Sequence, residues 1–291
     1  MVNVLTVDLE DWYCILDVGG PEIRRWGSLP ARLHKPTYKI LDLLERSGVR
    51  ATFFVLGWIA RRFPGLVADI AGAGHDIGSH GYAHELVYRQ TPERFRADIR
   101  ASVDAVASAC GVRPTAYRAP GFSITPQTPW AFEVLVEEGF KIDASIFPAR
   151  RGHGGWPGFR PCPCRILTGS GPLLEIPTTT VRVGPFRFAF SGGGYLRVLP
   201  YPLIKALARR ANAADLPVVF YIHPREFDPR HPRLPMGFRR RFKSYVALAS
   251  TPAKVRRLLA DFEFTSLSAL EPAADVEMET LRRRVVRKTE A

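Results

Sequence analysis

Cysteine is scarce in this sequence, with only four among 291 residues. The four lie scattered at positions 14, 110, 162 and 164, which excludes the dense disulfide framework of small secreted domains. A single proline separates Cys162 from Cys164, whereas zinc knuckles commonly place two residues between paired cysteines. We therefore predict four free thiols.

Long apolar runs are also missing. No stretch approaches the roughly 20 apolar residues that a membrane-spanning helix needs. The first apolar run meets Asp8 at once, without the basic start and longer apolar core of an export signal. We therefore expect a cytoplasmic protein, and peripheral attachment to the inner membrane face stays open as an alternative.

Acidic residues are few relative to basic ones. The 28 Asp and Glu face 41 Lys and Arg, which gives a net charge of +13 and favours an anionic neighbour. One basic cluster, Arg239 to Arg241, is flanked by Phe238 and Phe242. A second cluster lies in the tail and comprises Arg282, Arg283, Arg284, Arg287 and Lys288. Solvated helix faces would explain both clusters, and association with an anionic membrane surface or an acidic polymer is the alternative. We expect no specific nucleic-acid partner.

Apolar runs rich in Val, Ile and Phe alternate with segments of helical period. This alternation predicts βα units and a mainly parallel sheet. The expected strands are residues 2–7, 51–56, 75–78, 116–118, 141–144, 173–177, the neighbourhood of 181, 217–222 and 264–267. The expected helices are residues 37–46, 66–73, 92–110, 130–138, 203–213 and 252–261. The predicted fold class is α/β, a distorted (β/α) barrel of about seven mainly parallel strands.

We expect a single domain over residues 1–270. Barrel folds of this length commonly form one unit. Residues 151–163 are dense in Gly and Pro and are predicted to form a long surface loop. The basic tail over 271–291 loses its apolar pattern, which predicts a frayed helix or disorder.

Three carboxylates stand at the end of the first predicted strand: Asp8, Glu10 and Asp11. In extended geometry Asp8 and Glu10 project to the same side, and Asp11 lies where the chain turns. Active sites of parallel α/β barrels assemble at these strand ends. An acidic loop with a helix cap is the alternative interpretation.

Two imidazoles, His80 and His84, stand four residues apart in a polar loop after a predicted strand. They converge if the segment makes a helical turn. With a carboxylate from another strand they would form a two-His, one-carboxylate site with open positions, which suits zinc or another divalent metal. A histidine pair at the surface without a ligand is the alternative.

Two further residues follow predicted strands. Arg118 precedes a Pro-Gly bend, where its guanidinium could orient a carboxylate through two hydrogen bonds or form an ordinary ion pair. His223 follows five apolar residues and stands at the edge of the core, where its pKa could be tuned for proton transfer. A structural histidine bonded to backbone is the alternative.

These stretches, in this order, resemble the polysaccharide deacetylase or NodB-homology family, carbohydrate esterase family 4. The resemblance extends from residue 5 to about residue 268, through motifs at residues 6–8, 51–57, 80–84, 118–122 and 222–224. Longer phrases resemble the branch found in bacterial exopolysaccharide loci associated with exosortase systems. These phrases are residues 8–12, 143–148, 191–195 and 223–229.

The resemblance implies a metal-dependent hydrolase with three catalytic residues. Asp8 corresponds to the base, Arg118 fixes that carboxylate, and His223 corresponds to the acid. The resemblance implies that Asp143 either supports this machinery or contacts the substrate. Further candidates for substrate binding are Pro120, Gly121, Phe122 and Tyr195, with packing as the alternative role of the two aromatic rings.

The implied metal is divalent. Zinc is the first expectation, with cobalt, nickel or manganese as alternatives, on His80, His84 and one acid. The family's usual motif has two adjacent aspartates, whereas Leu9 stands at the second position here. The carboxylate ligand is therefore open between Glu10 and Asp11.

The predicted reaction is removal of N-acetyl groups from N-acetylhexosamine units of a bacterial polysaccharide or its lipid-linked precursor. A hydrolase of cyclic amides or other small non-peptide C–N bonds is one alternative, which would need a small closed pocket. A non-catalytic glycan-binding protein is another, although binding alone has no need of a base, an acid and a positioning arginine together.

Overall fold

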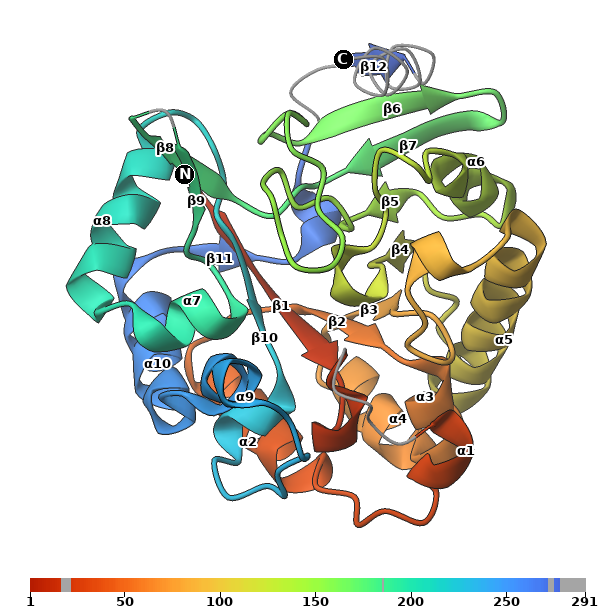
Figure 1. The fold of residues 1–291 in the computed structure, drawn as a ribbon, viewed down its shortest axis with the longest axis horizontal. Coiled ribbons are helices and arrows are strands. Elements are labelled where there is room, and N and C mark those ends of the chain that lie inside the picture. Colours follow the sequence, from red (N-terminus) through yellow and green to blue (C-terminus); the bar gives the residue numbers. More distant parts are fainter. Residues whose placement is uncertain (17–21, 185, 272–274, 278–291) are drawn as a thin grey trace.

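Seven neighbouring parallel strands form the centre of the fold (Figure 1). The structure is a computed structural model that describes residues 1–16, 22–184, 186–271 and 275–277. In spatial order the seven are β10 (Val219–Ile222), β1 (Asn3–Leu9), β2 (Thr52–Val55), β3 (Asp76–Ser79), β4 (Ala116–Tyr117), β5 (Ile142–Asp143) and β7 (Gly171–Glu175). Each pairs with its neighbour in parallel, which confirms the predicted α/β class with about seven mainly parallel strands.

The edges of the sheet differ from the prediction. Beyond β7 the sheet continues with β6 (Cys164–Thr168), which is antiparallel to β7, and then with β12 (Asp275–Glu277). β11 (Phe264–Thr265) pairs with the start of β1, and β8 (Thr180–Val183) forms a separate hairpin with β9 (Phe186–Ala189). The strand order runs from β10 to β12 as an open path, so the strands that the structure describes do not close into a complete barrel.

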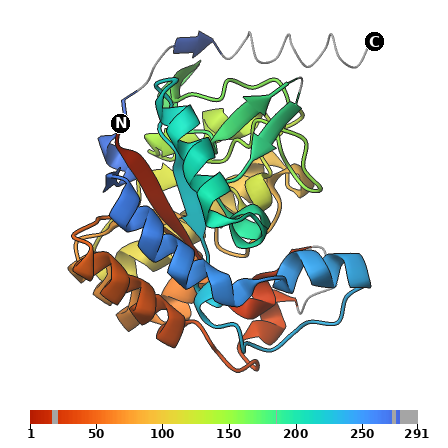
Figure 2. The same cartoon turned by 90° about the vertical axis from the view of Figure 1, so that its left-hand side faces the viewer.

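Helices surround the sheet (Figures 1 and 2). The six predicted helices are present as α2 (His34–Arg46), α4 (Pro64–Gly72), α5 (Pro92–Cys110), α6 (Trp130–Glu137), α8 (Tyr201–Asn212) and α10 (Thr251–Asp261). Four further helices were not predicted: α1 (Ile23–Trp26), α3 (Gly57–Arg62), α7 (Gly193–Val198) and α9 (Phe238–Tyr245). Short 3-10 turns are η1 (Trp12–Cys14), η2 (Val87–Arg89), η3 (Pro120–Phe122), η4 (Pro224–Phe227), η5 (Leu248–Ser250) and η6 (Leu267–Ala269).

The tail partly departs from its prediction. Residues 275–277 form a strand parallel to β6, where a frayed helix or disorder was expected. The basic cluster at positions 282–288 lies outside the described residues. All four cysteines are free, as predicted. None of the described helices combines the length and the apolar character that a membrane crossing requires.

The pleat of β1 directs the side chains of Thr6 and Asp8 to the inner face of the sheet. Leu5, Val7 and Leu9 pack in the large core between sheet and helices. Val4 packs instead with Phe54 in a second, inner cluster. Side chains alternate along a strand, so the even-numbered residues of β1 face inward. This places Asp8 in the sheet interior, near the C-terminal end of the strand.

Candidate functional site

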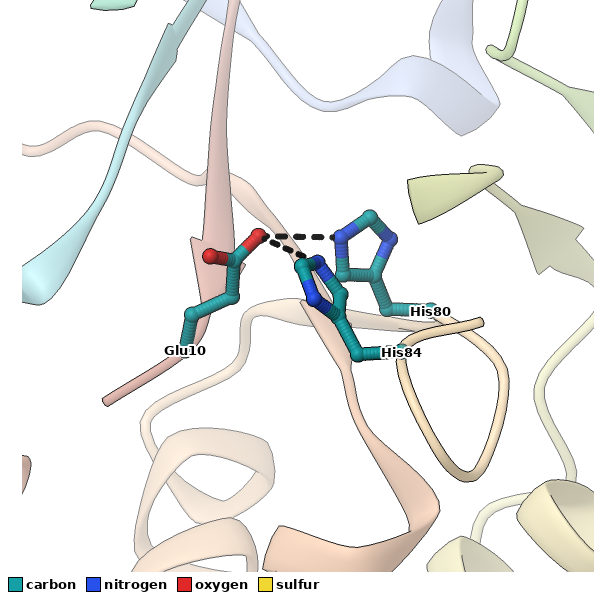
Figure 3. Close-up of side chains that lie close together, drawn as sticks. All are labelled: Glu10, His80 and His84. Atoms are coloured by element: carbon teal, nitrogen blue, oxygen red, sulfur yellow. Dashed lines mark hydrogen bonds and ion pairs between the residues drawn. The ribbon is translucent and has the colours of Figure 1, made fainter. Parts of the chain in front are cut away.

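Glu10, His80 and His84 converge at the C-terminal ends of β1 and β3 (Figure 3). Glu10 Oε1 lies 3.2 Å from His80 Nε2 and 3.0 Å from His84 Nε2. All three side chains are buried, and burial alone would raise the pKa of Glu10. The charge of His84 and hydrogen bonds from both imidazoles outweigh burial and hold that pKa well below its usual range.

This trio fits a divalent cation. His80 Nδ1 lies 2.6 Å from the carbonyl oxygen of Arg118, which places a proton on Nδ1 and leaves Nε2 as an acceptor facing Glu10. If the imidazoles are neutral with Nε2 unprotonated, the lone pairs of both Nε2 atoms point at Glu10 Oε1 and repel it. A proton or a cation between these atoms removes the repulsion. One ligand atom from each of the three residues lies within 4.8 Å of the others. Two imidazoles and one carboxylate are a donor set that zinc accepts.

The loop that carries the two histidines has an unusual backbone. Gly81 has φ 73° and His84 has φ 57°, a left-handed conformation that is rare for a residue with a side chain. Asp98 of α5 holds this loop, since its carboxylate accepts the backbone N–H of Tyr82 at 2.8 Å and of Ala83 at 3.1 Å. A Cβ at position 81 would lie 2.7 Å from Asp98 Oδ2, so the glycine permits this approach.

Asp11, the competing carboxylate of the sequence analysis, has another role. Its Oδ1 accepts the N–H of Trp12 at 2.7 Å, and its Oδ2 accepts the N–H of Arg32 at 2.9 Å. Both carboxylate oxygens of Asp11 therefore accept backbone N–H groups, one at the start of η1 and one in the loop before α2. Asp11 is outside the groups of described residues that could hold a metal ion.

Asp8 forms a buried ion pair with Arg118. Arg118 Nη1 donates to Asp8 Oδ1 at 2.8 Å and to Thr6 Oγ1 at 2.6 Å, while its Nε donates to the carbonyl of Ala144 at 3.2 Å. The guanidinium has no exposed surface and lies 4.3 Å from the ring centre of Phe54. These contacts fix one oxygen of Asp8 and leave the other directed toward the site.

His223 faces that second oxygen. Its Nε2 lies 3.9 Å from Asp8 Oδ2, and its Nδ1 lies 3.8 Å from Glu226 Oε1. Glu226 is fully buried, accepts the backbone N–H of His223 at 3.2 Å and pairs with Arg197 at 3.2 Å. Burial would lower the pKa of His223, but Glu226, Glu10 and Asp8 together raise it above its ordinary value.

Asp143 does not reach the surface of the site. It is fully buried on β5, opposite Glu175 of β7 in the strand register. Burial raises the pKa of both carboxyl groups, and the neighbouring charge of Asp143 raises that of Glu175 further. Ser145 donates to Asp143 at 2.5 Å and accepts the N–H of Ala119 at 2.8 Å. Asp143 therefore supports the segment after Arg118 and has no exposed surface to offer a substrate.

The other expected substrate-binding residues are only partly accessible. Pro120 is buried, and Phe122 is 3% exposed with its ring 5.2 Å from that of Tyr221, so neither offers a free surface. Gly121 is half-buried, with φ 63°, and a Cβ there would lie 2.7 Å from Leu16. Tyr195 is 47% exposed on α7, so its ring can meet a ligand at the surface.

Four polar residues of this region were missed by the sequence analysis: Glu175, Arg197 and Glu226, which are buried, and Asp98, which is half-buried. The sequence positions of Glu226 and Asp98 could have indicated a role in the site. Glu226 stands three residues after His223, and Asp98 lies beside the apolar stripe of its helix. Arg197 carried none, because it approaches Glu226 only through tertiary packing.

Two family models match the chain. Residues 28–136 match the polysaccharide deacetylase model, and residues 144–271 match a domain of unknown function, DUF3473. The first match contains the histidine pair and Arg118, and the second contains His223 and Glu226.

Curated relatives match over about a third of the chain. A peptidoglycan-N-acetylglucosamine deacetylase from Bacillus cereus is 38% identical over 98 residues, which are 33% of this chain and 36% of that protein. A peptidoglycan deacetylase from Helicobacter pylori is 32% identical over 108 residues, or 37% of this chain and 36% of that protein. The matched stretch thus spans about a third of the length of each relative.

Solved structures match over nearly the whole chain. A candidate polysaccharide deacetylase from Mycobacterium smegmatis has a TM-score of 0.58 and 22% identity, covering 99% of this chain and 92% of that one. A family 4 pseudoenzyme from Bacillus anthracis has a TM-score of 0.52 and 11% identity, covering 94% of this chain and 66% of that one. At these identities the two structures show the fold. The likeness in sequence to polysaccharide deacetylases therefore covers residues 28–136, and the likeness in fold extends over nearly the whole chain.

Proposed function

We propose that this protein removes N-acetyl groups from N-acetylhexosamine units of a bacterial polysaccharide or of its lipid-linked precursor. One observation carries the proposal: a candidate metal trio, a buried Asp8–Arg118 pair and His223 meet at one end of the sheet. A glycan-binding protein has no need of a carboxylate and an imidazole placed 3.9 Å apart beside such a trio.

Glu10, His80 and His84 would hold the metal. When bound, a divalent ion supplies a water of lowered pKa and polarises the acetyl oxygen. Zinc suits this donor set best, and cobalt, nickel or manganese are the alternatives.

Asp8 and His223 divide the proton transfers. Asp8 takes the proton of the attacking water through its free oxygen, while Arg118 fixes the orientation of the carboxylate. His223 protonates the departing sugar nitrogen, and the surrounding carboxylates favour the imidazolium form that this step needs. Arg118 is thus a positioning residue, and the other two are the catalytic pair.

The names of the relatives support the proposed substrate class. Those from Bacillus cereus and Helicobacter pylori are named for peptidoglycan, which contains N-acetylated sugars. The narrower resemblance to the exopolysaccharide branch and the expected cytoplasmic location remain parts of this proposal.

Acetate release from N-acetylhexosamine oligomers tests the proposal. Metal-stripped protein should release no acetate, and zinc or cobalt should restore release. Asp8→Asn should lower the rate by about 10²- to 10⁴-fold without loss of the metal, whereas His80→Ala should lose both. Asp104→Asn, an exposed acid on α5, is the matched control and should behave as the wild type.

Each other outcome has a distinct meaning. Stoichiometric metal without release from any oligomer would favour small cyclic amides as substrates. Release that Asp8→Asn leaves unchanged would overturn the assignment of the base. Glycan binding without metal binding would indicate a non-catalytic protein.

A further inference from the structure

Helix α9 exposes two large aromatic side chains at the surface. Phe238 is 83% exposed and Phe242 is 56% exposed. Residues four apart on a helix share one face, so the two rings form a single apolar strip. Large exposed apolar strips commonly mark interaction surfaces.

Exposed cations flank this strip. Arg239, Arg241 and Lys243 are all exposed on the same helix. Residues 224–245 contain seven Lys or Arg against two acidic residues. Neither acid offsets these charges, because Glu226 is buried against Arg197 and Asp228 pairs with Arg32 at 2.8 Å. The local surface is therefore apolar and cationic together.

Helix α9 is attached to the rim of the candidate site. Arg240 donates to the carbonyl of Leu16, in the segment that follows Glu10, at 2.5 Å. Arg225, two residues after His223, donates to the carbonyl of Ser244 at 3.3 Å. The segments that follow β1 and β10 thus contact this helix. Asp8 lies on β1, and His223 directly follows β10.

Helix α7 enlarges the apolar surface. Arg197 of α7 donates to the carbonyl of Lys243 at 2.6 Å, which joins α7 to the end of α9. Tyr195 and Val198 of α7 are 47% and 53% exposed. Figure 2 shows α9, the light blue helix on the right, at the periphery of the molecule.

We propose that α9, with the adjoining surface of α7, docks on an anionic lipid bilayer and holds the candidate site at the membrane surface. Helices with aromatic residues on one face and Lys or Arg beside them bind in the headgroup region. An aliphatic side chain such as Val198 fits hydrocarbon better than it fits a sugar or a nucleic-acid base. This favours a bilayer over an acidic polymer.

Flotation with lipid vesicles tests the docking. The full-length protein should float with vesicles of phosphatidylglycerol and phosphatidylcholine in equal parts, and not with phosphatidylcholine alone. Arg239→Gln with Arg241→Gln should weaken partition by about 25-fold, since each basic residue contributes roughly fivefold. Phe238→Ser with Phe242→Ser should weaken it by about tenfold or more.

The matched control is Arg209→Gln with Arg210→Gln, which removes two exposed charges from α8 and should leave partition unchanged. Circular dichroism checks that each variant is folded. Absence of vesicle binding by the wild type overturns the proposal, as does binding that survives both α9 variants, which would implicate the basic cluster at 282–288.

Two other results would also reject membrane docking. Loss of binding in the arginine variant alone would indicate unspecific charge attraction. Binding to an acidic polysaccharide or to DNA without vesicle binding would assign the surface to a polymer. The assay contains no substrate, so its failure is distinguishable from failure of the proposed deacetylation.

Discussion

His223 lies between two carboxylates that differ in role. Asp8 faces its Nε2 from the site, and Glu226 faces its Nδ1 from the interior. Glu226 also accepts the backbone N–H of His223, so one carboxylate holds both ends of the residue. We regard Glu226 as a positioning residue because its side chain has no exposed surface through which to meet substrate.

Glu226→Gln should shift the pH profile of acetate release. Burial lowers the pKa of His223, Glu226 is the largest influence that raises it, and the net pKa is raised. A general acid is active below its pKa, so loss of the Glu226 charge should move the alkaline limb of kcat/KM to lower pH. A pH series for wild type and variant measures the displacement.

A control separates charge from packing. Glu226→Gln leaves the buried Arg197 without its partner, which costs stability. The double variant with Arg197→Met removes this uncompensated charge and should keep the displaced alkaline limb. An unchanged limb in both variants would rule out an electrostatic effect of Glu226 on His223.

At the scale of elements, α5 fixes the loop between the two histidines. The carboxylate of Asp98 accepts two backbone N–H groups of that loop. It can approach so closely because Gly81 has no side chain in the way. Such supporting contacts orient metal ligands without touching the metal. The position of the histidine pair thus depends on a helix that begins after the loop has ended.

Asp98→Ala should weaken metal affinity by about 10- to 100-fold, because the loop loses its two anchors. A competition titration with a chelator measures the dissociation constant. Asp104→Ala, on an exposed position of the same helix, is the control and should keep the wild-type affinity. Equal affinities in the two variants would show that the loop holds its shape without Asp98.

The sequence predicted elements well where apolar periodicity was strong. Helix α5 was predicted over residues 92–110 and forms there; Thr91 caps it by accepting the N–H of Arg94, and Gly111 ends it with φ 73°. Helix α7 was missed because it begins in glycine. Helix α9 was missed because half of its residues are arginine or lysine, which hides its apolar positions. β12 was missed because a three-residue edge strand depends on a distant partner, here β6.

At the scale of the whole molecule, the candidate metal joins two strands that are separated by β2. Glu10 follows β1, and both histidines follow β3. A bound ion would therefore stabilise the assembled sheet and not only the local loop. Stability gained through binding depends on the ratio of free ligand to its dissociation constant.

Zinc at about 100 times its dissociation constant should raise Tm by roughly 5–10 °C. The rise should shrink at acidic pH, because protons compete for the imidazole nitrogens. Differential scanning calorimetry with and without zinc measures it, and His84→Ala should abolish it. A full rise in His84→Ala would place the stabilising metal elsewhere.

Sequence motifs predicted which strand ends carry the candidate site. They did not predict which groups each site residue contacts. Glu10 and Asp11 were equal candidates until the folded chain brought the N–H of Arg32 to Asp11. Asp143 had two expected roles, support of the site or contact with the substrate, and the register opposite Glu175 buries it. Both outcomes depend on tertiary contacts, which local spacing does not encode.

The short separation of Asp8 and His223 has a consequence for the catalytic cycle. Under the proposed mechanism, each turnover leaves Asp8 with an extra proton and His223 without one. The two groups lie on neighbouring strands, with 3.9 Å between Oδ2 and Nε2. One proton passed across that gap, directly or through a single water, regenerates both groups at once. The enzyme can thus recycle its proton internally and begin the next turnover without exchange with bulk solvent.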